Sequence, residues 1–367
     1  MVELNEKEAQ KTFSAFNTIA EMGHEQVVYC YDKPTGLKAI IAIHNTILGP
    51  ALGGTRMWTY QNDQEALIDV LRLSRGMTYK AAISGLNLGG GKAVIIGDPK
   101  NLKNEAFLRR FGRFVDSLSG RYITAEDMNM NTSDMVHISY ETDYVMGLPE
   151  SMNGSGDPSP VTAYGVFMGM KATAKKAYGN DNLHGKKISV QGVGQVGHYL
   201  VDHLIEDGAE VTITDINESN IKRVTDKHKV KVVKPEEIYD VDADIYAPCA
   251  MGATINDDSI ARLKANVIVG AANNQLAEEV RHGEMLKDKG IFYAPDFLVN
   301  AGGIINIFPE LMRNYNKPLA LEQTEKIYGK CLEILNKAEA EGKTSHQAAI
   351  EIADKRMADM GKVKLAY

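Results

Sequence analysis

Short apolar runs recur through the second half of the chain, and a helical or turn-rich segment separates each run from the next. Alternation of this kind is typical of parallel strands joined by helical crossovers. The segment from about Leu319 onward is rich in Ala, Glu and Lys and predicts helix. The runs that predict strands are KKISVQ, EVTITD, DADIYAPCA, NVIVGAAN and GIFYAPDFLV, which lie between residues 186 and 299.

The first half of the chain mixes short strands with amphipathic helices. Apolar side chains recur at spacings of three and four from Asp63 to about Ile83, which predicts a helix with one buried face. Apolar runs rich in β-branched residues predict strands on either side of it. The expected strands cover residues 37–46, 92–99 and 121–127, and a second helix is expected over residues 104–118.

Residues 148–165 are dense in Gly, Pro and Ser, a composition expected at a junction between domains. The chain of 367 residues is also longer than one hydrophobic core usually supports. We therefore expect an α/β protein of two domains, over residues 1–147 and 148–341. The C-terminal helical segment, residues 342–367, is expected to pack back on the first domain.

The composition is that of an ordinary globular protein and excludes several classes of partner. Hydrophobic residues make up 44% and charged residues 24%, and the formal net charge is -7. This charge leaves no basic face for DNA or RNA, so no nucleic-acid partner is expected. The chain has no apolar run of about 18 residues and no signal-peptide pattern. We expect a cytoplasmic protein without a membrane partner.

The cysteines and histidines predict neither a disulfide framework nor a metal site. Cys30, Cys249 and Cys331 are odd in number and widely spaced, so each is expected to be a small buried apolar residue. The nine histidines form no spacing typical of metal ligands. No metal is therefore predicted.

A glycine-rich motif follows the predicted strand KKISVQ and precedes an apolar helical stretch. It reads Gly192-Val193-Gly194-Gln195-Val196-Gly197, which fits GxGxxG, and Asp215 closes the next predicted strand about 20 residues further on. Alone such a match is weak, because a glycine turn can bind nothing. The strand before it and the helix after it make it a Rossmann-type dinucleotide site.

Each position of this motif has a physical role. Gly192 allows a tight turn, Gly194 lets a pyrophosphate approach the backbone, and Gly197 lets helix and strand pack closely. The helix N-terminus supplies amide donors and the positive end of a dipole. Asp215 is expected to accept hydrogen bonds from the ribose hydroxyls and to repel a 2′-phosphate, so NAD is predicted rather than NADP.

Three glycines, residues 89–91, stand directly before Lys92 and are read as a loop. A nucleotide P-loop is excluded, because Leu86 and Ala93 occupy the positions where it needs Gly and Ser or Thr. Glycines still allow the backbone to approach a small ligand closely. Lys92 is therefore a candidate for chemistry on a small molecule.

Lys80, Lys92 and Asp127 lie at the ends of three successive predicted elements, where they would line a cleft facing the dinucleotide domain. Two lysines close to one site disfavour each other's charge, so the pKa of one is expected to fall toward neutrality. A neutral amine is a general base, and the lysine that stays charged would suit a carboxylate. Taken singly, each of the three residues is more often a solvated surface charge.

A set of motifs makes the chain resemble a known family from about Phe16 to Ile307. The motifs resemble those of the amino-acid dehydrogenases of the leucine, valine and phenylalanine branch, and most closely its leucine-specific members. The resemblance implies reversible oxidative deamination of an L-amino acid to a 2-oxo acid and ammonium, with reduction of NAD. It rests on GPALGGTRMW, GMTYKAAISGLNLGGGKAVIIGDP, GRYITAED, DPSPVTAYGV, VQGVGQVG, IYAPCAMGATIN, GAANNQL and YAPDFLVNAGGIIN.

The resemblance assigns catalytic roles to three residues. Lys80 matches the lysine that binds the substrate α-carboxylate, Lys92 the base that activates water, and Asp127 the acid/base at the substrate nitrogen. It also implies that the first domain binds substrate and forms a homo-oligomer, an octamer or a dimer. The cofactor contacts that it implies, besides residues 192–197 and Asp215, are Thr162, Cys249, Ala250, Asn273 and Asn274, of which Asn274 also contacts substrate.

The substrate pocket implied by the resemblance is apolar. A glutamate enzyme needs a partner for a second carboxylate, because an unpaired buried charge is costly, and no such partner is present. Isoleucines at two of its positions narrow the cavity, which favours branched aliphatic substrates, leucine before valine and isoleucine. The implied pocket residues are Leu52, Ala125, Ile304 and Ile307, with Gly53, Gly54 and Met77 as a wall of the site.

Two alternatives remain beside a branched-chain enzyme. One is a phenylalanine dehydrogenase, and the other is a non-catalytic protein that responds to NAD. The sequence also departs from the family pattern at MNMNTSDM, residues 128–135, where a Gly-Thr-Thr type run is common. Substrate or cofactor contacts near residues 129–132 are therefore expected to differ.

Overall fold

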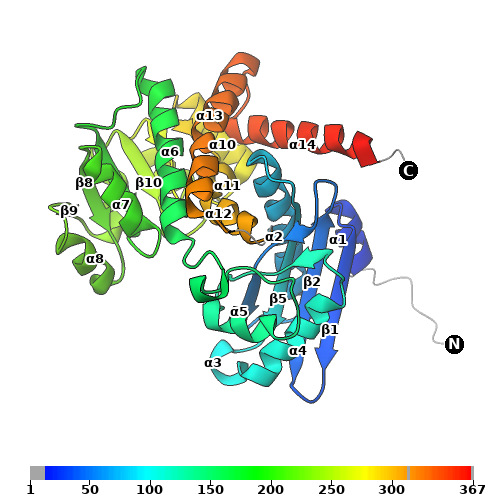
Figure 1. The fold of residues 1–367 in the computed structure, drawn as a ribbon. Helices are drawn as coiled ribbons and strands as arrows, with labels where there is room; N and C mark the ends of the chain where they lie inside the picture. The colour runs from blue at the N-terminus through cyan, green and yellow to red at the C-terminus, as the bar shows by residue number, and fades with distance from the viewer. Residues whose placement is uncertain (1–12, 312–314, 365–367) are drawn as a thin grey trace, which may run out of the picture. The chain divides into compact units, whose positions relative to one another are not determined.

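The computed structural model describes residues 13–311 and 315–364, which form two compact units (Figure 1). One unit holds the chain up to Thr78 together with Leu88–Met146. The second holds Tyr79–Asn87 together with the chain from Gly147 onward. One helix, α2 (Asp63–Ile83), contributes its last turn to the second unit. The functional domain limits of 1–147 and 148–341 stay a prediction.

The first unit is built on a six-stranded mixed sheet of order β1-β2-β5-β3-β6, with β4 paired to β5. The pairs β1–β2 and β2–β5 are antiparallel, and the remaining pairs are parallel. The strands are β1 (Gln26–Asp32), β2 (Leu37–Asn45), β3 (Ala51–Leu52), β4 (Thr55–Trp58), β5 (Gly89–Ile96) and β6 (Tyr122–Ile123).

Helices pack on this sheet through the apolar faces that the sequence predicts. The helix expected from Asp63 to Ile83 is confirmed as α2, whose Leu67, Val70 and Leu71 pack against Ile40 and Val94 of the sheet. The second expected helix is α4, which contacts β1 and β2. Besides α2, the described helices of this unit are α1 (Ala15–Glu21), α3 (Pro99–Leu102), α4 (Glu105–Asp116) and α5 (Thr132–Ser139).

The three glycines before Lys92 lie in β5 itself, so the expectation of a loop was wrong. A Cβ on Gly90 would lie 2.2 Å from the backbone nitrogen and from the hydroxyl of Thr78. A Cβ on Gly91 would lie 2.7 Å from the Tyr122 ring, and one on Gly89 would lie 1.9 Å from the Asn45 carbonyl oxygen. The glycines therefore let β5 approach α2 and its neighbouring strands, and the space beside them is filled by protein.

Gly90→Ala is expected to lower the free energy of unfolding by about 1–3 kcal/mol, because the new methyl group meets the backbone of α2. Gly76→Ala is the matched control, since nothing lies within 4 Å of a Cβ there and alanine favours a helix. Urea unfolding of both variants measures the difference. A Gly90→Ala protein as stable as the Gly76→Ala protein would contradict this account of β5.

The second unit contains a six-stranded sheet of order β12-β11-β10-β7-β8-β9. Every pair in it is parallel, as the alternation in the sequence predicts. The order reverses at β7, and ligands of such sheets bind at the carboxyl end of the strands at this point. The strands are β7 (Lys187–Gln191), β8 (Glu210–Thr214), β9 (Lys231–Val232), β10 (Ile245–Pro248), β11 (Val267–Ile268) and β12 (Phe292–Tyr293).

Several elements of this unit are shorter than the sequence predicts, among them β10 (Ile245–Pro248) and β11 (Val267–Ile268). The apolar run at 290–299 is a strand only over Phe292–Tyr293, because the chain turns at Pro295 into a short helix, α11 (Asp296–Val299). The predicted junction 148–165 contains a short 3-10 helix, η1 (Glu150–Met152), and its last part is helical. There α6 begins at Ser159 with a proline in its first turn, where a missing N–H costs nothing.

Helices cover the sheet and form the C-terminal region, with α6 packed against α7, α12 and α13 (Figure 1). The predicted helical tail is confirmed as α13 and α14. Among the described residues, no helix combines the length and apolarity needed to cross a membrane. The helices are α6 (Ser159–Tyr178), α7 (Gly197–Glu206), α8 (Glu218–Thr225), α9 (Asp257–Arg262), α10 (Glu279–Asp288), α12 (Gly302–Leu311), α13 (Lys317–Glu341) and α14 (Ser345–Lys364).

Candidate active site

Three charged side chains of the first unit come from neighbouring elements. Lys92 lies on β5, Arg56 lies on β4, and Asp127 follows β6. Arg56 is opposite Val94 in the β4–β5 register and Lys92 is two residues from Val94, so both basic side chains project from one face. Val94 packs against α2, which places the two basic residues on the face that α2 covers.

The Asp127 carboxylate contacts both basic groups. Lys92 Nζ lies 3.0 Å from Asp127 Oδ1, and Arg56 Nε donates to Asp127 Oδ2 at 2.8 Å. Arg56 also lies 3.2 Å from Asp69 of α2, and the Tyr60 hydroxyl donates to that carboxylate at 2.6 Å. The Lys92 side chain is only 7% exposed. Charge-assisted hydrogen bonds therefore hold a buried amine in one place.

Two opposing effects act on the pKa of Asp127. Burial raises the pKa, but the charges and hydrogen bonds of Lys92 and Arg56 lower it by more than burial raises it, and the pKa falls to about 2. Asp127 is therefore an ionised carboxylate at neutral pH. Such a carboxylate beside a buried amine is able to accept a proton from a bound ammonium group.

The glycines predicted as a wall of the substrate site lie against the same strands. A Cβ on Gly53 would lie 1.8 Å from the Gly91 carbonyl oxygen and 3.2 Å from Met77 Cγ. A Cβ on Gly54 would lie 2.1 Å from the Glu126 carbonyl oxygen and 3.0 Å from Asp127 Cβ. The backbone of this pair thus fits closely between β5 and the Asp127 segment. Leu52 and Ala125, two predicted pocket residues, are buried in the same unit.

The unusual segment after Asp127 has a structural role. Asn129 adopts a left-handed conformation, with φ of 62°, and its amide donates to the Met57 carbonyl at 3.0 Å. Asn131 caps α5 in a capping box with Asp134. Thr132 donates to the Glu126 carboxylate. These bonds tie the segment that carries Asp127 to β4 and α5.

Lys80, the third predicted catalytic residue, lies in the last turn of α2 and belongs to the second unit. Its ammonium donates to Asn273 Oδ1 at 3.2 Å, and Asn300 donates to the same oxygen at 2.8 Å. Asp296 is also near: burial raises its pKa, and the charge of Lys80 opposes that rise. Asn274, the predicted ligand beside Asn273, adopts a left-handed conformation with φ of 51°. Lys80 therefore faces amide and carboxylate oxygens.

The glycine-rich loop follows β7 as predicted. Gly192 has φ of 93°, and a Cβ there would lie 2.7 Å from Ala250 Cβ. A Cβ on Gly197, the first residue of α7, would lie 2.1 Å from the Gly192 carbonyl oxygen and 3.6 Å from Cys249 Cβ. A Cβ on Gly194 would meet nothing within 4 Å. The loop is thus closely packed at its ends and open at the position where a pyrophosphate approaches.

The side chains around this loop fit a dinucleotide. Asp215 follows β8 and accepts from the Val193 amide at 2.9 Å, which places its carboxylate beside the loop. Arg223 of α8 donates to the carbonyls of Val193 and Gly194, each at 2.9 Å. Gln195 is exposed at the tip of the loop, and Val196 precedes α7. The residues present therefore suit a pyrophosphate and a ribose.

Two predicted residues of the second unit, Thr162 and Ile304, lie on adjoining helices. Thr162 is in the first turn of α6, where its hydroxyl donates to the Pro158 carbonyl at 2.9 Å. A Cβ on Gly303 of α12 would lie 3.2 Å from that hydroxyl oxygen, so the two helices approach closely at this point. Ile304 is buried and Ile307 half-buried on α12.

The cysteines follow the prediction at two of three positions. Cys30 and Cys331 are buried, while Cys249 is half-buried because it lies beside the glycine-rich loop. Burial raises the pKa of the Cys249 thiol to about 12, so it is not a thiolate at neutral pH. Among the residues that the structure describes, no three His, Cys, Asp or Glu side chains gather as metal ligands.

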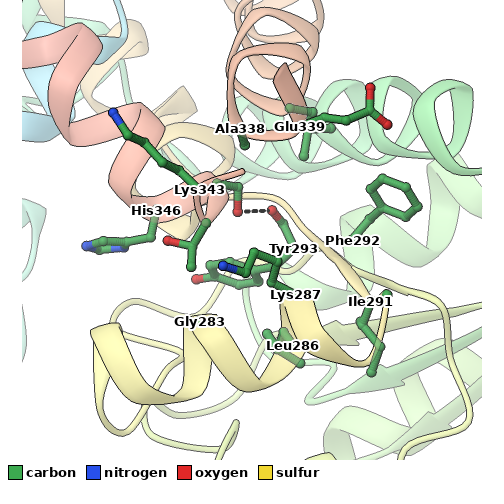
Figure 2. Close-up of a pocket in the computed structure, with 14 residues that line it drawn as sticks. Gly283, Leu286, Lys287, Ile291, Phe292, Tyr293, Ala338, Glu339, Lys343 and His346 are labelled. Carbon is green, nitrogen blue, oxygen red and sulfur yellow. Dashed lines mark hydrogen bonds between the residues drawn. The ribbon is translucent and has the colours of Figure 1, made fainter. Parts of the chain in front are cut away.

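A cavity of about 220 Å³ lies in the second unit, and none of the predicted site residues lines it (Figure 2). Apolar side chains such as Leu286 and Leu335 line it, and Lys287 and Lys343 stand at its edge. Each of these lysines already pairs with a glutamate. The cavity therefore offers apolar contacts but no uncommitted cation for a charged ligand.

Sequence reasoning missed two charged residues of these clusters. Arg56 stands in the motif GGTRMW, yet only the pairing of β4 with β5 brings it near Asp127. Asp296 follows a strand end, which is a common place for a functional carboxylate, but its nearness to Lys80 depends on the packing of α2. No local signal in the sequence identifies either neighbour.

Comparison with known families gives matches to both halves of the chain. Residues 24–144 match the model described as Glu/Leu/Phe/Val dehydrogenase, dimerisation domain. Residues 154–219 and 212–364 match the model described as Glutamate/Leucine/Phenylalanine/Valine dehydrogenase.

Individual relatives are similar over nearly their whole length. The chain is 54% identical to leucine dehydrogenase of Bacillus subtilis (strain 168) over 352 residues, 96% of this chain and 96% of the relative. It is 50% identical to phenylalanine dehydrogenase of Lysinibacillus sphaericus, over 89% of this chain and 86% of the relative. The crystal structure of L-tryptophan dehydrogenase from Nostoc punctiforme has a TM-score of 0.83 and 45% identity, covering 94% of this chain and 98% of that chain.

Proposed function

The chain belongs to the Glu/Leu/Phe/Val dehydrogenase family and is an amino-acid dehydrogenase, and from this premise we propose that it oxidatively deaminates branched-chain L-amino acids, with leucine preferred. The products are the 2-oxo acid and ammonium, with NAD as the hydride acceptor, and the reaction is reversible. The observation that carries the proposal is the buried Lys92 amine, 3.0 Å from the ionised Asp127.

The proposed roles follow from the chemistry of each side chain. Lys80 holds the substrate α-carboxylate by charge, and Asp127 accepts a proton from the substrate ammonium group. Bound nicotinamide would supply the acceptor for the hydride from Cα, and loss of that hydride leaves a protonated imine. Lys92, in its neutral form, takes a proton from the water that attacks the carbon of the protonated imine, which gives a neutral carbinolamine. Asp127 then returns its proton to the nitrogen, which leaves as ammonia while the carbon–oxygen double bond forms. The ammonia takes the hydroxyl proton and becomes ammonium, and Lys92 releases its proton to solvent.

The proposed substrate class follows from the residues of the side-chain pocket. Leu52, Ala125, Ile304 and Ile307 are all apolar, and a second substrate carboxylate would have no cation among them. Leucine, valine and isoleucine differ by single methylene groups, each of which is worth only about 1–3 kcal/mol. We therefore expect activity on all three.

The cofactor of the family is a nicotinamide dinucleotide, and we propose NAD for this chain. The Asp215 carboxylate beside the loop is suited to ribose hydroxyls and repels a 2′-phosphate. Arg223, the nearby cation, is engaged by two loop carbonyls.

The match to a dimerisation domain indicates an oligomer. We propose a cytoplasmic homo-oligomer, an octamer or a dimer, whose partners are its amino acid and 2-oxo acid and neither nucleic acid nor a membrane.

Steady-state NADH formation with leucine, valine, isoleucine and phenylalanine tests the proposal. We expect kcat/KM to be highest for leucine and at least about tenfold lower for phenylalanine, because the pocket positions carry isoleucines. The same assay with NADP is expected to give a kcat/KM at least about tenfold lower than with NAD.

A second candidate is an aromatic amino-acid dehydrogenase, favoured by the 50% identity to a phenylalanine dehydrogenase. Faster turnover of phenylalanine than of leucine would establish this alternative. Absence of NAD reduction with every amino acid would instead indicate a non-catalytic NAD-responsive protein.

A further inference from the structure

Arg356 of the C-terminal helix α14 reaches the end of α2. Its guanidinium donates to the carbonyl oxygens of Ala82, Gly85 and Leu86 at 2.9, 2.9 and 2.8 Å, and to Asn87 Oδ1 at 3.0 Å. These residues and α14 belong to the same compact unit. The Arg356 side chain thus donates hydrogen bonds to four acceptors in the single turn around Gly85.

The end of α2 needs such donors. The last four carbonyls of any helix lack partners within the helix. Gly85, with φ of 78°, ends α2 in a left-handed conformation. The amides of Gly85 and Leu86 bond back to Ala82 and Ala81 at 3.2 and 3.0 Å, which is the Schellman pattern. Arg356 adds a cation at the negative end of the helix dipole and bonds to carbonyls on both sides of Gly85.

Lys80 lies in the turn that these bonds hold. Its carbonyl accepts from the amide and the hydroxyl of Ser84 at 3.2 and 2.7 Å, so its backbone is part of the same hydrogen-bonded turn. Its half-buried side chain extends to Asn273. A shift of the last turn of α2 therefore moves the Lys80 ammonium directly.

We propose that Arg356 is a positioning residue for substrate binding, through which α14 holds the last turn of α2 so that Lys80 stays where it receives the substrate α-carboxylate. This inference rests on the proposed function of Lys80. The planar guanidinium is suited to the task, because its five donors reach several carbonyls at once, whereas a lysine ammonium is a point charge.

Arg356→Gln tests the proposal in the full-length enzyme. The contact between Lys80 and the carboxylate is made in the ground state and in the transition state alike, so its loosening raises KM and leaves kcat unchanged. We expect the KM for leucine to rise roughly tenfold or more, with kcat and the KM for NAD within about threefold of wild type. Amide exchange is expected to speed up in the peptide that covers residues 79–87.

Lys355→Gln is the matched control, because it removes one positive charge from the adjacent, exposed position of α14. We expect it to leave the KM for leucine unchanged. Arg356→Lys keeps the charge and replaces Arg356→Gln in the test if the glutamine variant fails to fold. Its KM for leucine is expected to lie between that of wild type and that of Arg356→Gln. Arg356→Ala is also expected to have a raised KM for leucine. Guanidinium chloride at millimolar concentration is expected to lower that KM, because the free ion can occupy the place of the missing side chain.

The outcomes separate this inference from the proposed function. If wild-type enzyme oxidises leucine and the Arg356 variants match Lys355→Gln in their KM for leucine, the inference is overturned, even where exchange at residues 79–87 is faster. If wild-type enzyme does not oxidise leucine or a related amino acid, the proposed function itself fails.

Discussion

Lys92→Ala is expected to lower kcat for leucine oxidation by about 10²- to 10⁴-fold, the range typical of losing a general base. The Lys92 side chain is 7% exposed and its amine lies 3.0 Å from Asp127, whose other cationic partner in the first unit, the Arg56 guanidinium, does not act as a base. Asp127 keeps its bond to Arg56 in the variant, which limits the structural damage. Turnover should therefore fall far more than stability does.

Lys92→Arg separates proton transfer from simple charge. A guanidinium keeps a positive charge beside Asp127 but does not lose its proton in proteins. We expect this variant to be as inactive as Lys92→Ala. Lys38→Ala is the control, because Lys38 is an exposed lysine on β2 of the same sheet. Stopped-flow and steady-state NADH formation, with circular dichroism and NAD binding as checks on folding, measure the effect.

The result that would contradict this role of Lys92 is specific. If Lys92→Arg retained near-normal turnover, a charge at this position would suffice and no base would be needed. If folded Lys92→Ala retained it, neither the base nor the charge would matter to the reaction.

Asp127→Asn is expected to lower kcat by a similar factor of about 10² to 10⁴, because the amide no longer accepts a proton from the substrate nitrogen. The neutral side chain also weakens both ion pairs, with Lys92 and with Arg56. Asp69→Asn is the matched control, since Asp69 shares Arg56 and pairs with Tyr60. We expect it to reduce stability while kcat stays within a few-fold of wild type.

The stability lost in Asp127→Asn should depend on pH in a defined direction. The pKa of Asp127 is lowered in the folded protein, from its usual value of 3.8 to about 2. A lowered pKa means that the ionised side chain stabilises the fold above about pH 4, by about 2 kcal/mol, and that this contribution disappears as the pH falls through 2. Urea unfolding of both proteins from pH 7 to pH 3 measures it. If the free energies of unfolding of wild type and Asp127→Asn differed by the same amount at pH 3 and pH 7, the lowered pKa of Asp127 would be contradicted.

Patterns that repeat over short distances were predictable because they depend on neighbours in the chain. The spacing of apolar residues from Asp63 to Ile83 predicted α2, since a helix returns to one face every three or four residues. The alternation of apolar runs predicted a parallel sheet, because crossovers require helices between strands. GxGxxG predicted a loop whose glycines are tightly packed at Gly192 and Gly197 and open at Gly194.

The same reasoning failed where glycine has more than one physical use. Residues 89–91 were expected to be a loop with space for a ligand, but they are a buried part of β5. A missing Cβ serves a turn, a ligand or the close approach of another chain segment equally well. Only the packed neighbours, Thr78 and Tyr122 among them, decide which use applies.

The partners of Lys92 and Asp127 within the first unit are not indicated by the sequence. The motifs predict catalytic roles for Lys92 and Asp127, and these roles stay a prediction, as does the nearness of Lys80 to Lys92. In the structure the neighbours of Lys92 are Asp127 and, through that carboxylate, Arg56.

Local order could thus be read from the chain alone, because it depends on the spacing of residues, and side-chain chemistry was enough to propose the reactive groups. The neighbours of each charge could not, because they come from distant segments. Arg56 and Asp127 are 71 residues apart, and Arg356 and Ala82 are 274 residues apart. Sheet pairing and helix packing bring such residues together, and no window of sequence contains that information.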